Sequence, residues 1–246
     1  MKDKKNIIKD KYGEIAQNNS GCGCSCCGGD SNEDISSQVG YSQDEIKEGG
    51  EANMGLGCGN PLASSDIAEG ETVVDLGAGG GFDCFLASKK VGEAGKVIGV
   101  DMTREMVEKA RENARKKEVD NVEFKLAEME NLPFEDDSAD VIISNCVINL
   151  SPDKDKVFSE AYRILKKGGR IYVSDIVLLE ELSEEQRNDK ELLTGCVAGA
   201  LLKEEYLGKI KKAGFEVEIL SENKDISKKQ YKRINPESLT VKGVNK

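Results

Sequence analysis

Histidine is absent from this 246-residue sequence, and that absence narrows the chemistry open to the protein. Catalysis by a Ser-His-Asp triad or a Cys-His pair is excluded, as are zinc sites and proton shuttles that depend on histidine. Long apolar runs are also missing, since none approaches the roughly 18 residues that would span a membrane. Residues 1–5 lead into no apolar segment, so we expect no secretory signal and a cytoplasmic location.

Positive charge is in short supply. The sequence has 35 Lys and Arg residues against 46 Asp and Glu residues, which gives a net charge of −11. A chain this acidic repels phosphate backbones, so we expect no nucleic-acid partner. Cysteine, by contrast, is plentiful, with eight residues. Because the sequence carries no export signal, we expect these to be reduced thiols rather than a disulfide framework.

From about residue 70 onwards, strand and helix patterns alternate. Apolar runs predict strands, and amphipathic stretches between them predict helices. The strands are expected at 72–76, 96–101, 122–126, 140–144, 170–174, 216–220 and 239–244, and the helices at 82–88, 103–117, 155–165 and 203–213. This alternation predicts an α/β, Rossmann-like fold, in which a mostly parallel seven-stranded sheet carries helices on both faces.

The sequence divides into three regions by composition. We expect an N-terminal region with a helix and a flexible Cys-rich segment, a main domain with an insertion, and a basic C-terminal tail with a possible edge strand. These are residues 1–40 (helix 1–16, loop 17–37), 41–222 (insertion 176–202) and 223–246. The cluster Cys22, Cys24, Cys26 and Cys27 does not have the spacing of a structural zinc site. It is either a soft-metal capture segment or a tail without a catalytic role.

A glycine-rich loop follows the first expected strand. Gly77, Gly79 and Gly81 fit G-x-G-x-G but neither the dinucleotide fingerprint nor a P-loop. Asp75 precedes the loop, where an acid suits a cationic ligand better than a pyrophosphate. Asp101 ends the second strand, where an acid accepts hydrogen bonds from ribose hydroxyls. Together these residues predict binding of an adenosine that carries a positive charge, namely S-adenosylmethionine.

The loop after the third strand flanks the expected adenine site. Glu128 or backbone groups of this loop are candidates to bind the adenine amino group, and the alternative is that Glu128 is a surface acid. The fourth strand ends at Ser144-Asn145-Cys146. Methyltransferases that act on base amino groups usually carry an N-P-P-Y-like stretch here, and its absence argues against nucleic-acid methylation.

Three cysteines lie where they can approach that cofactor. Cys58 stands between glycines upstream of the first strand, Cys146 follows the fourth strand, and Cys196 lies in the insertion after the fifth. A single cysteine is most often a small buried side chain, and we interpret Cys84 in this way. Because parallel strands end at one edge of the sheet, at least Cys146 and Cys196 can converge there. Converging thiolates favour a soft electrophile.

At these residues the sequence resembles the arsenite S-adenosylmethionine methyltransferases, which have the class I methyltransferase fold. The resemblance covers about residues 41–220, and its most specific parts are the three cysteine contexts. The matching stretches are 57–61, 75–81, 99–103, 145–150, 174–177, 194–201 and 203–206.

The resemblance implies that Cys146 and Cys196 hold As(III), while Cys58 completes the site and takes part in disulfide chemistry. The arsenic lone pair attacks the methyl carbon, so no general base is needed, in agreement with the missing histidine. The substrate is arsenite or its thiol conjugate. Oxidised arsenic is then reduced by enzyme thiols or by an external thiol reductant, thioredoxin or glutathione.

For the cofactor, the resemblance implies that Asp75 orients the charged end, Asp101 binds the ribose, Met102 packs on the adenine and the Asn145 backbone contacts the methionine part. Two other hypotheses stay open at this stage. A quinone or sterol C-methyltransferase would have an apolar pocket and no converging thiols. A non-catalytic protein that sequesters metals by thiols would bind As(III) without needing the acids.

Overall fold

A computed structural model of the protein describes residues 4–18, 31–224 and 234–246. Cys22, Cys24, Cys26 and Cys27 lie outside these ranges, so the hypotheses about the cysteine cluster concern residues that the structure does not describe. Within the described residues, no helix combines the length and apolar character needed to cross a bilayer.

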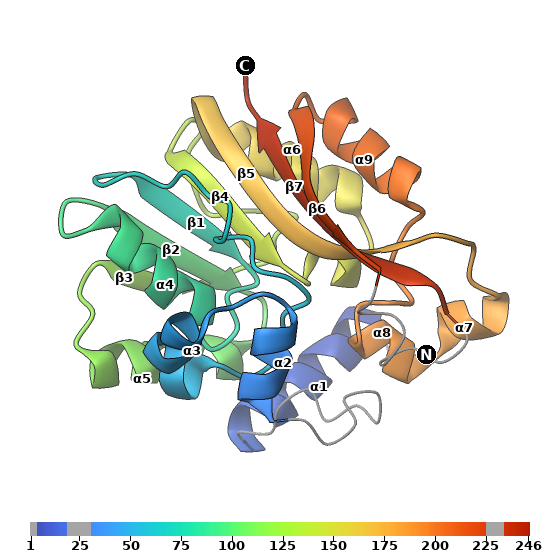
Figure 1. The fold of residues 1–246 in the computed structure, drawn as a ribbon, viewed down its shortest axis with the longest axis horizontal. Helices are drawn as coiled ribbons and strands as arrows, with labels where there is room; N and C mark the ends of the chain where they lie inside the picture. Colours follow the sequence, from blue (N-terminus) through green and yellow to red (C-terminus); the bar gives the residue numbers. More distant parts are fainter. Residues whose placement is uncertain (1–3, 19–30, 225–233) are drawn as a thin grey trace.

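A seven-stranded sheet forms the centre of the molecule, in the order β3-β2-β1-β4-β5-β7-β6 (Figure 1). The strands are β1 (Thr72–Leu76), β2 (Lys96–Asp101), β3 (Val122–Leu126), β4 (Ala139–Asn145), β5 (Leu165–Leu178), β6 (Glu216–Asn223) and β7 (Pro236–Val244). Strands β1 to β5 pair in parallel, and β7 is antiparallel to both β5 and β6. The predicted fold class, an α/β Rossmann-like methyltransferase fold, is confirmed.

The position of the last strand corrects one expectation. Residues 239–244 were expected to form an edge strand in a C-terminal tail, but β7 lies inside the sheet between β5 and β6. Leu239 and Val241 of β7 are almost fully buried, whereas β6 is largely exposed along its length. The apolar residues of β7 therefore take the interior position, and the polar β6 forms the edge.

Helices cover both faces of the sheet. They are α1 (Lys4–Asn18), α2 (Asn32–Gln38), α3 (Gln43–Gly49), α4 (Phe82–Val91), α5 (Arg104–Lys117), α6 (Lys154–Ile164), α7 (Glu184–Asn188), α8 (Lys190–Thr194) and α9 (Lys203–Lys212). Because side chains alternate along a strand, neighbouring residues of β1 enter different cores. Val73 packs with Phe85 of α4, and Val74 belongs to the core that contains Phe158 of α6 and Tyr206 of α9.

The N-terminal region contains more helix than expected. Residues 17–37 were expected to be a loop, but α2 begins at Asn32, and α3 follows it. Ser31 and Ser42 each accept a hydrogen bond from the backbone of the third residue of the following helix, and the Asp34 or Glu45 side chain bonds back. These capping boxes satisfy backbone groups at the helix starts and are the sequence signal for both helices.

Helix α1 lies across the carboxyl edge of the sheet, beside α5 and α8 (Figure 1). Its Ile8 packs with Leu150 and Leu193, and its Ile15 packs with Met54 and Met106. The segment expected to be an insertion, 176–202, begins with the last residues of β5. It then forms α7 and α8, and so returns the chain to the same edge of the sheet.

Candidate active site

The glycine loop and the first turn of α4 form the floor of a cavity at the carboxyl edge of the sheet. Gly77 and Gly79 line the cavity. Gly77 has a φ of 71°, and a Cβ there would lie 2.4 Å from Cγ2 of Val147, so only glycine fits. Gly81 does not line the cavity but caps α4 with a φ of 93°. The backbone N–H groups of Gly77 and Ala78 both donate to the carbonyl oxygen of Val100, which fixes the loop against the end of β2.

Three carboxyl groups line this cavity: those of Asp75 and Asp83, which are buried, and that of Asp101, which is half-buried. Burial, reinforced by the neighbouring Asp83, raises the pKa of Asp75 well above its usual value. Burial raises the pKa of Asp83 to about 6. Burial also raises the pKa of Asp101, although its oxygens accept hydrogen bonds from the backbone N–H groups of Gly79 at 3.0 Å and Thr103 at 2.8 Å. The cavity therefore favours a cationic ligand, which would stabilise these groups in their ionised form.

Asn145 connects this cavity to the cysteine loop. Its Nδ2 donates to the hydroxyl oxygen of Tyr41 at 2.8 Å, to the carbonyl oxygen of Gly59 at 2.8 Å and to Oδ2 of Asp83 at 3.2 Å. Its Oδ1 accepts a hydrogen bond from the backbone N–H of Cys58 at 3.1 Å. The Tyr41 hydroxyl donates to the other oxygen of Asp83 at 2.6 Å. One amide side chain therefore fixes both a cavity acid and the backbone of Cys58.

Of the two residues expected near the adenine, Met102 lies at the cavity and Glu128 does not. Met102 lines the cavity, as do Ala127 and Met129 from the loop after β3. The carboxylate of Glu128, however, accepts hydrogen bonds from Lys5 at 2.8 Å and Lys9 at 3.0 Å on α1, and these lower its pKa. Glu128 does not line the cavity, so its carboxylate holds α1 in place instead of lying beside the ligand.

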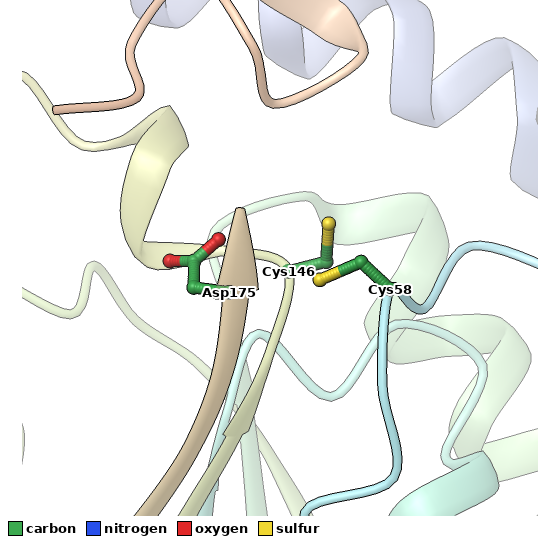
Figure 2. Close-up of side chains that lie close together, drawn as sticks. All are labelled: Cys58, Cys146 and Asp175. Atoms are coloured by element: carbon green, nitrogen blue, oxygen red, sulfur yellow. The ribbon is translucent and has the colours of Figure 1, made fainter. Parts of the chain in front are cut away.

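Cys58, Cys146 and Cys196 come from three distant parts of the chain and meet beside the cavity. The sulfur atoms of Cys58 and Cys146 and a carboxylate oxygen of Asp175 all lie within 4.8 Å of one another (Figure 2). The Cys196 thiol is not part of that group. It donates to the carbonyl oxygen of Cys146 at 2.7 Å and lies 4.0 Å from the Tyr12 hydroxyl of α1. Cys146 also lines the cavity.

The backbone at two of these cysteines is strained. Cys146 has a φ of 57° and Cys196 a φ of 64°, in the left-handed region that non-glycine residues rarely adopt. Such a conformation costs about 1–3 kcal/mol and persists only where surrounding contacts impose it. The backbone N–H of Cys146 donates to the carbonyl oxygen of Ser174 at 2.8 Å. Backbone strain is common at functional sites, and here both strained residues are cysteines that lie next to each other beside the cavity.

The three thiols are protonated at neutral pH. Burial raises the pKa of Cys58, and the hydrogen bond with Cys146 together with burial raises the pKa of Cys196. At Cys146, the hydrogen bond from Cys196 lowers the pKa. The hydrogen bond that Cys146 donates to Cys58 and the burial of Cys146 outweigh it, so the pKa lies well above its ordinary value. The three thiols themselves therefore carry no charge in the ligand-free protein.

The sequence analysis did not predict a role for several residues of the site. Asp83 follows the glycine loop directly and lies at the start of α4, but we expected no role for it. Tyr41, Tyr12 and Asp175 reach the site through tertiary packing alone. Cys84 is buried, as expected, and its thiol donates to Oδ2 of Asp75 at 3.2 Å. Cys84 therefore helps to hold the carboxyl group of Asp75 in its position beside the cavity.

Comparison with known proteins identifies the family. A family model described as a methyltransferase domain matches residues 67–214. The crystal structure of an arsenic (III) S-adenosylmethionine methyltransferase from Chlamydomonas reinhardtii superposes with a TM-score of 0.65 and 34% sequence identity, over 86% of this chain and 73% of that chain. The chain belongs to the arsenite methyltransferase family.

Curated relatives carry the name of this family. Arsenite methyltransferase of Halobacterium salinarum is 47% identical over 209 residues, which cover 85% of this chain and 53% of the relative. The human arsenite methyltransferase is 42% identical over 168 residues, which cover 65% of this chain and 44% of the human protein. The chain thus spans about half the length of these two curated relatives.

Proposed function

We propose that this protein transfers a methyl group from S-adenosylmethionine to trivalent arsenic bound by the thiolates of Cys58, Cys146 and Cys196. The observation that carries the proposal is the position of the Cys146 thiol. It lines the cavity that Asp75, Asp83 and Asp101 also line, and it contacts the other two thiols.

The residues of the cavity fit the cofactor. Bound S-adenosylmethionine supplies an electrophilic methyl group on a positively charged sulfur. Asp75 and Asp83 are buried acids that a cation would stabilise in the ionised form, since their pKa values are raised without one. Asp101 ends β2, where an acid binds ribose hydroxyls, and Met102 offers an apolar side chain to the adenine. Gly77 and Gly79 allow close approach of the backbone.

Charge balance favours trivalent arsenic at the thiols. Arsenous acid is neutral, and its condensation with three protonated thiols gives a neutral tris-thiolate complex and three water molecules. No net charge enters a buried region that already contains several acids. A divalent ion on three thiolates would leave one net negative charge there, which burial disfavours.

Binding by all three sulfurs requires one rearrangement. The Cys196 thiol has to leave the carbonyl oxygen of Cys146 and turn towards the other two thiols. The bound arsenic then lies beside the cavity through Cys146. Since trivalent arsenic keeps a lone pair and has no proton to lose, the residues need only to position it, and accurate positioning contributes about 7–11 kcal/mol.

Methylation forms the arsenic–carbon bond with the arsenic lone pair and breaks the bond between the methyl group and the sulfonium sulfur, so that S-adenosylhomocysteine leaves and the arsenic becomes pentavalent. Two thiolates return two electrons to the arsenic and become one disulfide, and Cys58 and Cys146 are close enough to supply them. An external thiol of the thioredoxin or glutathione class then reduces the disulfide, so that the site is free for another cycle. We propose this reductant as the second small-molecule or protein partner.

The test is incubation with labelled S-adenosylmethionine, arsenite and a thiol reductant, followed by speciation of the arsenic. The proposal predicts labelled methylarsenicals. Binding of S-adenosylmethionine with no methylated arsenic would contradict the proposal and favour a C-methyltransferase of another substrate. A protein that binds arsenite but does not bind S-adenosylmethionine at all would contradict the proposal and favour sequestration.

A further inference from the structure

Asp175 is a charged group next to the thiols for which methyl transfer gives no role. It lies on β5 with no exposed surface. Its carboxylate accepts hydrogen bonds from Nδ2 of Asn149 at 2.8 Å, from the Tyr206 hydroxyl at 3.0 Å and from the backbone N–H of Ile176 at 2.9 Å. Several donors thus hold this carboxylate in a fixed position, which is how proteins orient a metal ligand.

The position of the carboxylate suits a metal ion shared with two thiols. Its oxygen and the sulfur atoms of Cys58 and Cys146 lie within 4.8 Å of one another, and the three residues approach from different segments of the chain (Figure 2). In a tetrahedral zinc site, bonds of about 2.3 Å to sulfur and 2.0 Å to oxygen separate the ligand atoms by about 3.5–3.8 Å. The three ligand atoms therefore need to move together by roughly an ångström.

A nearby cation balances the charge that such a complex would carry. A divalent ion with two thiolates and one carboxylate has a net charge of −1. The ammonium group of Lys154 is buried, donates to the carbonyl oxygen of Ser151 at 3.1 Å and is attracted by Asp175. The metal complex and Lys154 together are neutral. This balance differs from that of trivalent arsenic, which three thiolates neutralise on their own.

We propose that Cys58, Cys146 and Asp175 form a site for a divalent cation of the zinc class, with a water molecule as the fourth ligand and with the protonated Cys196 thiol beside it. Binding displaces the protons of the coordinating thiols into solvent and forms metal–sulfur and metal–oxygen bonds, with no change of oxidation state. Mixed sulfur and oxygen ligands suit Zn²⁺, or Co²⁺ in its place. The site needs no cofactor and does not depend on the proposed methyl transfer.

One consequence does rest on the proposed function. Because the metal uses two of the thiols assigned to arsenic, bound Zn²⁺ and arsenite exclude each other. We expect Zn²⁺ to inhibit arsenic methylation competitively with arsenite and without effect on the binding of S-adenosylmethionine. If methylation of arsenic is not found, the metal site can still be tested by direct binding.

The test is a Co²⁺ titration of the full chain in which Cys22, Cys24, Cys26 and Cys27 are replaced by serine, so that only the site can bind through several thiols. We expect one ion per chain, with sulfur-to-cobalt charge-transfer absorption and the intense visible bands of a tetrahedral complex. Asp175→Asn is expected to weaken binding at least 10-fold. Absence of a saturable complex with one ion, or unchanged affinity in Asp175→Asn, would overturn the proposal.

Two further measurements separate a lost ligand from a damaged fold. Tyr206→Phe removes a hydrogen bond to the same carboxylate but keeps the carboxylate itself, so we expect its affinity to stay within about three-fold of the parent. An equal loss in both variants would contradict a ligand role for Asp175. Zinc K-edge X-ray absorption of the parent is expected to give sulfur and oxygen neighbours together, and a shell of sulfur alone would exclude the carboxylate.

Discussion

Replacement of Asp83 by asparagine is expected to stabilise the ligand-free protein and to weaken cofactor binding. Burial raises the pKa of Asp83 to about 6 from an ordinary value of 3.8. At pH 7 the ionised carboxylate therefore costs the folded state about 3 kcal/mol relative to the unfolded chain. The amide removes this cost, but its N–H₂ group would face Nδ2 of Asn145, which now donates to Oδ2. This mismatch costs about 1 kcal/mol.

The net gain for Asp83→Asn at pH 7 is about 2 kcal/mol, which raises the Tm of a chain of this size by roughly 4–8 °C. The pH dependence of unfolding tests independently whether the ionised Asp83 destabilises the folded protein. A raised carboxyl pKa stabilises the fold when the group is protonated, fully below about pH 4, and this contribution is lost as the pH rises through 6. The advantage of the variant should therefore vanish near pH 4 and grow up to about pH 6.

The assay combines thermal unfolding at pH 4 and pH 7 with calorimetric titration of S-adenosylmethionine. We expect affinity to fall at least 10-fold, because one of the carboxylates that favour a cation is lost. Asp66→Asn is the matched control. Burial alone would raise the pKa of Asp66, but hydrogen bonds from Lys242, Tyr172 and Arg170 lower it, so its loss should destabilise the fold and spare cofactor affinity. A variant of Asp83 that is less stable at pH 7, or that binds the cofactor normally, would refute the reasoning.

Other predictions concern the thiols, the glycine loop and helix α1. Cys146→Ser and Cys196→Ser should each abolish arsenic methylation and leave the Kd for S-adenosylmethionine within about two-fold of the parent, as measured by speciation and calorimetry. Turnover of arsenite at the parental rate in both variants would rule out the proposed arsenic site. Gly77→Ala should destabilise the protein by more than about 2 kcal/mol and abolish cofactor binding, since the new methyl group meets Val147. Gly79→Ala has open space around it and should cost only about 1 kcal/mol of strain in chemical denaturation. An equal loss in the two glycine variants would contradict the packing argument. Glu128→Gln should raise the dissociation rate of the cofactor a few-fold, because α1 loses the ion pairs of Lys5 and Lys9 with Glu128 and keeps that of Lys5 with Glu130. Helix α1 contributes Ile8 and Tyr12 to the cavity wall. Stopped-flow measurements test this expectation, and an unchanged rate at low salt would show that α1 does not hold the ligand.

The fold could be predicted from the sequence because it follows from local patterns. Apolar runs and amphipathic stretches alternate, and each gives one element of a parallel sheet. Gly77, Gly79 and Gly81 have the positive φ angles that the turn needs. What local patterns do not contain is the order of strands. The position of β7 between β5 and β6 depends on which apolar strand buries more surface against its neighbours.

The site could be predicted in part for the same reason. Asp75, Asp101 and Cys146 each end a strand or lie next to one, so their meeting at one edge follows from topology. Asp83 was missed because the first turn of a helix usually faces solvent, and here Tyr41 from α2–α3 covers it. Asp175 was missed because its neighbours Cys58 and Cys146 come from distant segments of the chain and approach it only in the folded protein. The expectation for Glu128 did not take into account two lysines more than 100 residues away in the chain.

The most direct measurement is the arsenic K-edge X-ray absorption spectrum of the As(III) complex of the full chain with Cys22, Cys24, Cys26 and Cys27 replaced by serine. Three sulfur neighbours are expected around the arsenic, falling to two when Cys58, Cys146 or Cys196 is also replaced by serine. An arsenic atom that keeps three sulfur neighbours in any of these variants, or that has oxygen neighbours in the chain with all three cysteines intact, would contradict the account.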